Sequence, residues 1–427
     1  MLQSMRINGG SPINGTIEIS GSKNLALPAL AAALLTDKDV TLHNVPNLED
    51  VKSMLNLLFH LGVDMGSLEN GTITLTSKDL KTFNAEYDFV RKMRASILVL
   101  GPLVSRFKKA SVSLPGGCAI GARGVDLHIK ALEHMGANIT IENGYINASA
   151  PHGLIGCDIN FPISTVTGTE NIIMAASLAK GTTRIINAAM EPEITALAEL
   201  LIGMGAKIKG HGTSIITIVG VEALSGTSFT ILPDRIETGT YAIAAALTNG
   251  KLLLKNCKYD HLSSFFETLH LAGIANKVYR RVDCEHDDIE VWRERDIINP
   301  VNIQTAPFPG FATDLQAQFM TLMTICDGTS SITENIFENR FMHIPELSRM
   351  GANISVYGKT AIVTGQSYLK GTNVMATDLR ASVSLVLAGL VARGETIVNR
   401  LYHIDRGYEN IDCKLQMCGA KIERFTA

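Results

Sequence analysis

Residues 125–150 read VDLHIKALEHMGANITIENGYINASA, and this stretch contains the local pattern from which the fold can be predicted. Its first half places apolar residues at helical spacing and ends at Gly136, as an amphipathic helix does when a glycine occupies the position after its last turn. Its second half reads as two strand-like runs joined by Asn143 and Gly144, a dipeptide typical of a tight hairpin turn. The stretch therefore predicts a helix, a glycine stop and a β-hairpin.

The same junction recurs through the whole chain. An apolar residue, a glycine and a small or branched residue stand together six times, about 70 residues apart, and such a period indicates a duplicated supersecondary unit. Glycine turns that feed further strands, preceded by alanine-rich helices, fill the intervals. We therefore predict an α/β fold of six repeated units, each with the order strand, helix, strand, helix, strand, strand. The six junctions begin at Leu61, Met135, Met204, Ala272, Met350 and Cys418.

Six units suggest two lobes of three. The last junction glycine lies at position 419 of 427, which leaves no room for a final hairpin partner, so we expect the strand Gly15–Ser20 to complete that unit and hold both termini in one lobe. A cleft between two lobes is where ligands commonly bind. The predicted lobes are a continuous one, residues 22–232, carrying the loop around Cys118, and a discontinuous one, residues 1–21 plus 233–427, carrying Asp314 and a set of arginines.

Composition narrows the class of protein. The chain has 427 residues, a formal net charge of −3 and a hydrophobic fraction of 46%, which fits a folded globular protein and gives no electrostatic case for nucleic-acid binding. No apolar run approaches the roughly 20 residues that span a bilayer, and the N-terminus lacks a signal-peptide core. The seven cysteines are scattered, without CxxC pairs or metal-ligand spacing, so we expect a cytoplasmic protein with no metal and no disulfide framework.

The most suggestive chemistry lies in the loop 113–128, SLPGGCAIGARGVDLH. Pro115 and the paired glycines predict a loop that can approach a ligand closely. Cys118 would be exposed there, and Arg123 would favour its thiolate. The alternative is an inert small residue in an ordinary turn.

Further candidates lie at predicted helix starts, where backbone amides and cations favour anionic ligands. Lys23 opens an apolar helix within ISGSKNLALP, and its alternative is a solvated surface lysine. Arg94 precedes a strongly apolar helix, and its alternative is a side chain that reaches back to water. The turn at residues 161–171, FPISTVTGTEN, either binds phosphate or simply caps the helix that follows.

The second lobe contributes an acid and three arginines. Asp314, in PGFATDLQAQF, is either a helix N-cap or a general base. Arg340, Arg380 and Arg406 stand at comparable places in successive units, and each taken alone is an ordinary salt-bridging residue. Together with Lys23 and Arg123 they form a set of cations suited to a small ligand with a carboxylate and a phosphate, because arginine binds both groups in bidentate fashion.

Read together, these stretches resemble the enolpyruvyl transferases over essentially the whole chain. The resemblance implies an inside-out α/β barrel of two lobes with three βαβαββ units each. It implies transfer of enolpyruvate from phosphoenolpyruvate to the 3′-hydroxyl of UDP-N-acetylglucosamine with release of phosphate, the first committed step of peptidoglycan synthesis, with no cofactor. It rests on ISGSKN, MRAS, LPGGCAIGAR, VDLH, LPDRIETGT, TDLQAQF, FENRFMH, PELSRMGA, MATDLRAS and YHIDRGYE, in that order.

The resemblance also implies a role for each site residue. Cys118 would give a proton to C3 of phosphoenolpyruvate and be the target of fosfomycin, and Asp314 would take the hydroxyl proton. Lys23, Arg123 and Arg406 would hold the phosphate, and Arg340 and Arg380 the carboxylate. The sugar nucleotide would contact Asn24, Arg94, Arg123, Gly124, Val125, Asp126, Leu127, Ile163, Ser164, Thr165, Val166, Asp314 and Ile336.

Two other functions stay open from the sequence. One is a non-catalytic paralogue that binds a nucleotide sugar, against which the retained Lys23, Cys118 and Asp314 argue. The other is 3-phosphoshikimate 1-carboxyvinyltransferase, against which the residues around Cys118 argue. Gly124, Ala312 and Ile163 depart from the family pattern, at positions that bear on loop stiffness and nucleotide affinity.

Overall fold

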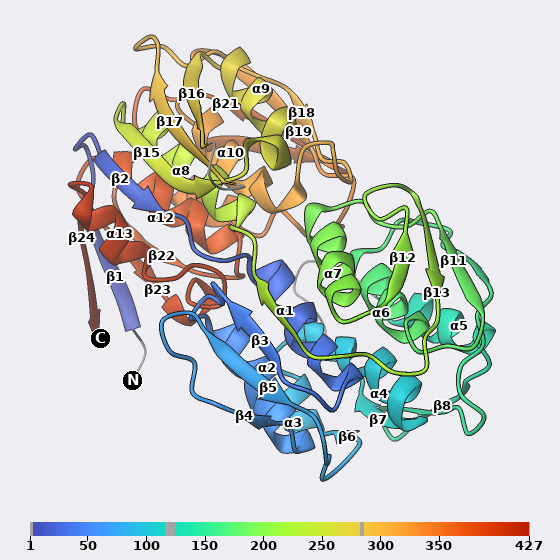
Figure 1. The fold of residues 1–427 in the computed structure, drawn as a ribbon. Coiled ribbons are helices and arrows are strands. Elements are labelled where there is room, and N and C mark those ends of the chain that lie inside the picture. Colours follow the sequence, from blue (N-terminus) through green and yellow to red (C-terminus); the bar gives the residue numbers. More distant parts are fainter. Residues whose placement is uncertain (1–2, 116–123, 282–285, 427) are drawn as a thin grey trace. The chain divides into compact units, whose positions relative to one another are not determined.

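The computed structural model describes residues 3–115, 124–281 and 286–426 (Figure 1). Cys118 and Arg123 lie outside these ranges. The chain divides into two compact units, which we call the discontinuous unit (residues up to 20, and 233 onward) and the continuous unit (residues 21–232). The chain passes from one unit to the other between residues 20 and 21 and between residues 232 and 233.

One segment of the continuous unit shows the repeat in full. Its two strand–helix pairs and final hairpin form a four-stranded sheet in the order β10-β11-β13-β12, in which β10 and β11 are parallel and the other pairs antiparallel. This is the predicted order of strand, helix, strand, helix, strand, strand. The elements are β10 (Asp158–Asn160), α6 (Val166–Ala176), β11 (Thr182–Ile186), α7 (Pro192–Gly203), β12 (Lys207–Lys209) and β13 (Ile215–Val219).

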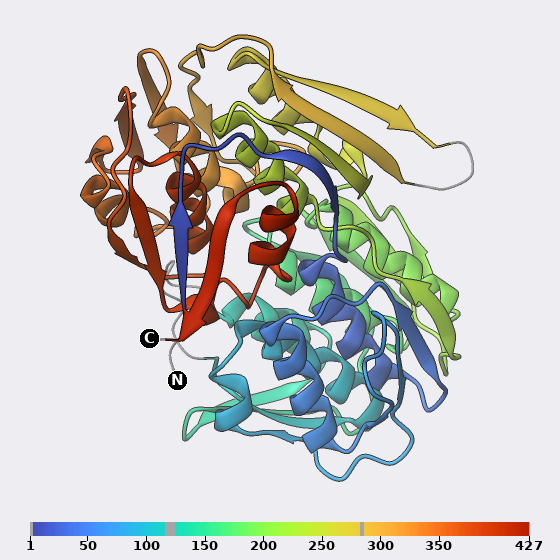
Figure 2. The same ribbon diagram turned by 90° about the vertical axis from the view of Figure 1, so that its left-hand side faces the viewer.

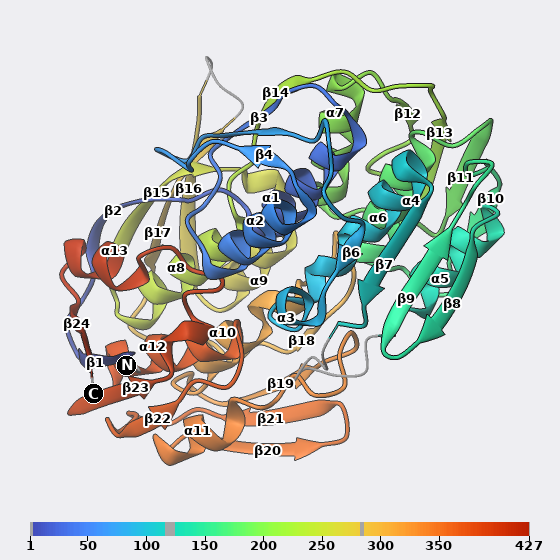
Figure 3. The same ribbon diagram turned by 90° about the horizontal axis from the view of Figure 1, so that it is seen from below.

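The continuous unit contains two further four-stranded sheets with the same spatial order of strands, β6-β7-β9-β8 and β14-β3-β5-β4, although β14 comes from the end of this unit and does not precede β3 in the chain. Their strands are β3 (Val40–His43), β4 (Asp64–Met65), β5 (Ile73–Thr76), β6 (Asn84–Ala85), β7 (Lys109–Ser113), β8 (Asn138–Glu142), β9 (Tyr145–Ser149) and β14 (Thr227–Thr230). The helices are α1 (Lys23–Ala32), η1 (Ala33–Leu35), α2 (Glu49–Leu61), α3 (Tyr87–Val90), η2 (Arg94–Val99), α4 (Leu100–Phe107) and α5 (Asp126–His134). In Figure 3, α4 and α6 lie side by side in the interior of this unit.

The discontinuous unit repeats the plan in three sheets, β22-β23-β1-β24, β16-β17-β15-β2 and β18-β19-β21-β20. Its strands are β1 (Gln3–Asn8), β2 (Asn14–Glu18), β15 (Lys251–Cys257), β16 (Ile274–Arg280), β17 (Asp287–Arg293), β18 (Ile303–Gln304), β19 (Thr329–Thr333), β20 (Asn353–Tyr357), β21 (Thr360–Thr364), β22 (Asn373–Met375), β23 (Glu395–Asn399) and β24 (Lys421–Thr426). Its helices are α8 (Arg235–Leu247), η3 (Tyr259–Leu262), α9 (Ser263–Leu271), η4 (Thr313–Leu315), α10 (Gln316–Met323), α11 (Ile344–Arg349), α12 (Ala381–Val391), η5 (Leu401–His403) and α13 (Ile411–Met417). The predicted α/β class with six repeated units is confirmed.

The N-terminal strand that completes the sixth unit is not the predicted one. Gly15–Ser20 was expected there, but β1 runs antiparallel between β23 and β24, as Figure 2 shows beside the two chain ends. Residues 14–18 instead form β2, which pairs in parallel with β15 of another sheet. β1 suits the inner position because Met5 and Ile7 alternate along it and are fully buried.

The glycines of the six junctions end the helices as predicted. All six adopt positive φ, between 86° at Gly273 and 102° at Gly62, a conformation that side chains with a Cβ rarely adopt. At the quoted junction the amide of Gly136 donates to Glu133 O and that of Ala137 to Leu132 O, which is the Schellman pattern. The hairpin turn is confirmed by positive φ at both Asn143 and Gly144.

Each unit has its own hydrophobic core around buried helices. In the discontinuous unit α8, α10 and α12 pack against one another, and almost every residue of the three is buried. Because almost all of their side chains are buried, residues that can meet a ligand are expected mainly in the segments where these helices begin. Among the helices in the described parts of the chain, none is both long and apolar enough to cross a membrane.

Candidate active site

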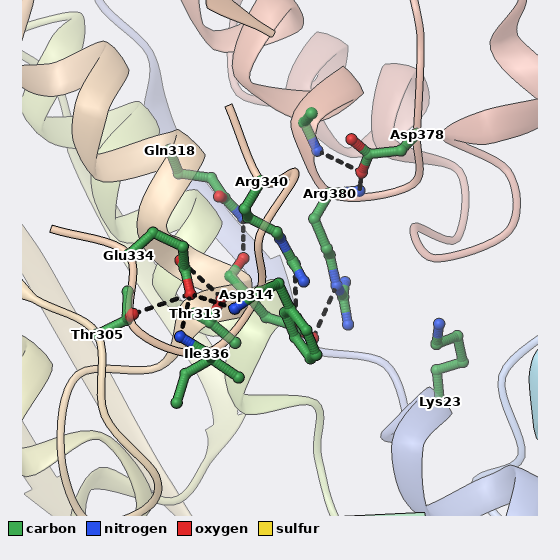
Figure 4. A network of polar contacts seen from close by, with 12 residues as sticks. Lys23, Thr305, Thr313, Asp314, Gln318, Glu334, Ile336, Arg340, Asp378 and Arg380 are labelled. Carbon is green, nitrogen blue, oxygen red and sulfur yellow. Dashed lines mark hydrogen bonds and ion pairs between the residues drawn. The ribbon is translucent and has the colours of Figure 1, made fainter. Parts of the chain in front are cut away.

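Asp314 lies between two arginines at the starts of the buried helices. It belongs to η4, directly before α10, and its Oδ1 accepts a hydrogen bond of 2.7 Å from Nη2 of Arg340. Its Oδ2 accepts one of 3.3 Å from Nε of Arg380, the residue that precedes α12 (Figure 4). The structure therefore brings together three predicted site residues that lie in three separate sequence motifs.

The cluster is built from buried cations. Arg340 is 5% exposed and Arg380 2%, and a buried guanidinium without an anion is costly. Burial by itself would lower the pKa of Arg380, but its interactions with Tyr408, Asp314 and Asp234 outweigh burial and raise the pKa above its usual value. Both terminal nitrogens of Arg380 are buried and have no hydrogen-bond partner among the described residues. Arg380 can therefore hold Asp314 through Nε and still offer two donors to a second anion.

The guanidinium of Arg380 packs over the aromatic ring of Tyr408, a residue that was not predicted to belong to the site. The guanidinium carbon lies 5.4 Å from the centre of the Tyr408 ring. The Tyr408 hydroxyl is 2.9 Å from the Thr240 hydroxyl and accepts a hydrogen bond of 3.2 Å from the Gln318 amide. Gln318 also donates to the backbone oxygen of Asp314, over 2.9 Å. One polar network thus holds both the arginine and the acid.

Asp378 has a different role from Asp314, although both follow a threonine and precede a leucine. Its Oδ1 accepts hydrogen bonds from the backbone amides of Arg380 and Ala381, over 2.9 and 3.0 Å, so it caps the start of α12. The N-cap interpretation, which was open for Asp314, therefore describes Asp378. This cap fixes the backbone from which the Arg380 side chain extends.

Arg406 lies in the turn that follows η5 and is partly buried. The neighbouring Asp405 accepts two hydrogen bonds from Arg424, over 2.8 and 2.9 Å, and Arg424 also binds Asp412. The carboxylate next to Arg406 in the sequence is thus engaged by another arginine.

In the continuous unit, Lys23 is the first residue of α1. It is 7% exposed, and its Nζ lies 3.4 Å from Oδ2 of Asp50, which rules out a solvated surface lysine. Asn24 follows it and is half-buried. A buried lysine at a helix start is suited to an anion, because its charge adds to the free amides there.

The remaining predicted residues of this unit form two turns at helix starts. Arg94 begins η2, and its Nη2 donates to the backbone oxygen of Gly124 over 3.3 Å. Val125 directly precedes α5, which begins with Asp126 and Leu127. Ile163, Ser164 and Thr165 lead into α6, which Val166 begins. Thr165 caps α6 by accepting from the Gly168 amide, and Ile163 is 66% exposed.

His128 joins these two turns and was not predicted as a site residue. It is 2% exposed, and its Nε2 and Nδ1 lie 3.3 Å from the Thr167 hydroxyl and 3.0 Å from the Asn171 amide nitrogen of α6. Burial, followed by the charge of Arg94, lowers its pKa to about 4, while Asp126 acts in the opposite direction. The neutral ring thus links the start of α5 to α6.

His343 lies behind the arginine cluster and predicts a measurable pH dependence of stability. It is fully buried, and burial lowers its pKa from 6.5 to about 4, with Asp378 opposing and Arg340 reinforcing the shift. Between pH 6.5 and pH 4, His343 is protonated in the unfolded chain but stays neutral in the folded chain. The free energy of unfolding therefore falls as the pH drops toward 4. At pH 5 this residue alone should cost about 2 kcal/mol relative to pH 7.

The measurement is urea unfolding at pH 7 and pH 5 for the wild type and for His343→Asn. We expect the wild type to lose about 2 kcal/mol more than the variant between the two pH values. Equal losses in the two proteins would show that His343 is not held neutral. Comparing each protein with itself removes any change that the substitution causes at both pH values.

Among the residues that the structure describes, no group of three or more His, Cys, Asp or Glu side chains could hold a metal ion. The cluster at Asp314 instead combines an acid with two arginines, a set suited to an anionic ligand and to proton removal.

Comparisons with known proteins agree with this chemistry. The family model for EPSP synthase (3-phosphoshikimate 1-carboxyvinyltransferase) matches residues 7–415. The UDP-N-acetylglucosamine 1-carboxyvinyltransferase of Rhodospirillum centenum is 54% identical over 435 aligned residues, covering 99% of both chains. Its namesake from Agrobacterium fabrum is 52% identical over 432 residues, with the same coverage of both chains.

Solved structures confirm the fold implied by the resemblance. The enolpyruvyl transferase NikO from Streptomyces tendae matches with a TM-score of 0.88 at 24% identity, over 100% of this chain and 99% of that one. EPSP synthase from Acinetobacter baumannii matches with a TM-score of 0.77 at 18% identity, over the full length of both chains. The match of the family model to nearly the whole sequence, together with these relatives, shows that the chain belongs to the EPSP synthase family of enolpyruvyl (carboxyvinyl) transferases.

Proposed function

We propose that this protein transfers the enolpyruvyl group of phosphoenolpyruvate to the 3′-hydroxyl of UDP-N-acetylglucosamine and releases phosphate. The relatives that carry this name match it from end to end at 52–54% identity. The observation in the structure that carries the proposal is Asp314 held by two buried arginines, one of which has two unused donors. This arrangement provides a base for a hydroxyl next to a binding site for a carboxylate.

The chemistry is an addition followed by an elimination. The sugar oxygen bonds to C2 of phosphoenolpyruvate, C3 gains a proton, and a tetrahedral intermediate forms. The C2–O bond to phosphate then breaks, C3 loses a proton, and the enol ether and phosphate leave. Such a sequence needs a base for the hydroxyl, an acid for C3 and fixed cations for the charges that develop.

Asp314 is suited to be the base. It lies between two guanidinium groups, and its side chain keeps a 24% exposed fraction through which a hydroxyl can approach. Removal of the hydroxyl proton would weaken its ion pairs with Arg340 and Arg380 as the carboxyl becomes neutral. The terminal nitrogens of Arg380 can then hold the substrate carboxylate more tightly.

The other roles follow from the family resemblance. We assign Cys118 as the proton donor to C3 and as the residue that fosfomycin alkylates, and we assign Lys23, Arg123 and Arg406 to the phosphate. The buried position of Lys23 at a helix start supports this. We assign Asn24, Arg94, residues 123–127, residues 163–166 and Ile336 to the sugar nucleotide. Because both substrates are water-soluble metabolites, we place this first committed step of peptidoglycan synthesis in the cytoplasm.

The test is phosphate release from phosphoenolpyruvate with either UDP-N-acetylglucosamine or shikimate 3-phosphate as acceptor. We expect release with the UDP-sugar alone, and a decrease in kcat of about 100-fold or more in Cys118→Ser, because a serine hydroxyl is a far weaker acid than a thiol. Release with shikimate 3-phosphate alone would give the chain the activity that names its family model. UDP-sugar binding without turnover would identify a non-catalytic paralogue.

A further inference from the structure

Glu334 is a buried carboxylate that no part of the proposed mechanism uses. It follows β19 directly and is 3% exposed. Four donors surround it, and all four are neutral: the Thr305 and Thr313 hydroxyls and the backbone amides of Ile336 and Phe337. Burying a carboxyl group costs free energy that burying a hydrophobic side chain at this position would not cost. A glutamate here is therefore expected to have a specific role.

The two oxygens of Glu334 accept hydrogen bonds from three places along the chain: Thr305, Thr313 and the turn 336–337. Oε1 accepts from Thr305 over 2.9 Å, from the Ile336 amide over 2.8 Å and from the Phe337 amide over 3.1 Å. Oε2 accepts from the Thr313 hydroxyl over 2.9 Å. In Figure 4 these bonds converge on Glu334 from the turn that leads to Arg340 and from the segment that carries Asp314.

Thr313 is the residue immediately before Asp314, in the single turn of η4. A turn this short has little rigidity of its own, and Ala312, which precedes it, does not restrict the backbone as a proline would. Oε2 of Glu334 therefore anchors the side chain of Thr313, the residue next to Asp314. Oε1 fixes Ile336, which we assign to the sugar nucleotide, and the start of the segment that ends at Arg340.

We propose that Glu334 is a positioning residue: it holds the segment that carries the Asp314 carboxylate at a fixed position relative to the turn 336–340. This inference rests on the proposed function of Asp314 as the base. Glu334 does not touch the reacting atoms. Its hydrogen bonds tie Thr313, which directly precedes the base, to Ile336 and Phe337 at the start of the turn that leads to Arg340, so that the acceptor hydroxyl and Asp314 meet at the right distance. Misplacing a catalytic group by about 1 Å can cost 100-fold in rate.

The sharpest test removes only the bond on the Asp314 side. Thr313→Val keeps the shape of the side chain but loses the hydroxyl, and Thr313→Ser keeps the hydroxyl but loses a methyl group. We expect kcat to fall by about 10- to 100-fold in the valine variant, with the KM for phosphoenolpyruvate changed by less than threefold. The serine variant should stay within threefold of the wild type.

A matched control lies one residue before Glu334. The Thr333 hydroxyl makes a 2.9 Å contact with the Thr360 hydroxyl, so Thr333→Val also loses one threonine hydrogen bond of 2.9 Å, but one that does not involve Glu334. We expect its kcat to stay within twofold of the wild type. If Thr313→Val loses no more activity than Thr333→Val, or if Thr313→Ser is as impaired as Thr313→Val, Glu334 does not act through this hydroxyl and the inference is wrong.

A second measurement does not depend on turnover. Backbone amide exchange should accelerate in residues 312–316 in Thr313→Val, and in both 312–316 and 335–340 in Glu334→Gln, because a glutamine cannot accept at both of its terminal atoms. Unchanged exchange at 312–316 in both variants would overturn the inference. If the wild type transfers no enolpyruvyl group, the proposed function fails, and the exchange pattern still decides whether Glu334 holds the two segments together.

Discussion

Replacing Asp314 by asparagine is expected to lower kcat by about 10²- to 10⁴-fold, because an amide cannot take the hydroxyl proton and general-base catalysis contributes a factor of this size. The isosteric change keeps the shape of the side chain between Arg340 and Arg380. The KM for UDP-N-acetylglucosamine should therefore change by much less than kcat. Steady-state phosphate release at saturating concentrations of both substrates measures the effect.

The same variant should also be less stable. Arg340 and Arg380 are nearly inaccessible to solvent, and removing the anion between them leaves two buried charges uncompensated. Breaking a buried ion pair by removing one partner costs about 3–5 kcal/mol, which urea unfolding would detect. Phosphate release should be measured where the variant is fully folded.

The control for Asp314→Asn is Asp327→Asn, which changes an exposed aspartate of the same unit. We expect its kcat and stability to match those of the wild type. A kcat for Asp314→Asn within tenfold of this control would contradict the assignment of Asp314 as the base and point to another group for proton removal.

The second large effect is expected for Arg380→Lys, which keeps the charge but removes the planar fork. Arg380 binds Asp314 through Nε and has two buried terminal nitrogens without a partner. A lysine ammonium cannot make the Asp314 contact and also present two parallel donors to the carboxylate of phosphoenolpyruvate. Losing two charge-assisted hydrogen bonds, at about 1.5–3 kcal/mol each, should lower kcat/KM for phosphoenolpyruvate by about 10²- to 10⁴-fold.

The loss in kcat/KM should be specific to phosphoenolpyruvate. The affinity for UDP-N-acetylglucosamine, which calorimetry measures directly, should change much less. Arg349→Lys provides the matched control, since Arg349 is an exposed arginine of the same unit that donates to the backbone oxygen of Asn373. If the KM for phosphoenolpyruvate rises by less than threefold in Arg380→Lys, the carboxylate is held elsewhere.

The sequence predicted the repeat and its boundaries well, because the governing interactions are local. Each junction glycine must adopt positive φ to end its helix, a requirement that depends only on the adjacent backbone. The same is true of the Asn143-Gly144 turn. The strand that completes the sixth unit was predicted wrongly, because pairing β1 rather than β2 with β23 joins segments almost 400 residues apart and leaves no local signal.

The residues that support the site could not be found from their own sequence neighbourhoods. Glu334, Tyr408 and His343 lie in motifs that the resemblance quotes or adjoins, but nothing local distinguishes them from surface glutamate, core tyrosine or exposed histidine. Their roles come from burial and from partners on other elements. The one local hint was that His343 and Tyr408 follow Arg340 and Arg406 by two or three residues.

Two copies of one tripeptide show which properties follow from the sequence alone and which depend on the tertiary structure. Thr313-Asp314-Leu315 and Thr377-Asp378-Leu379 stand at equivalent places before α10 and α12, and the sequence alone determined that each lies at the start of a buried helix. Asp378 satisfies the free amides of its own helix, which is a local interaction. Asp314 is drawn to Arg340 and Arg380, which are 26 and 66 residues away, because two buried cations stabilise a carboxylate more strongly than backbone amides do. Only folding brings those two arginines to Asp314. The tertiary structure therefore decides that Asp314 pairs with cations while Asp378 caps a helix.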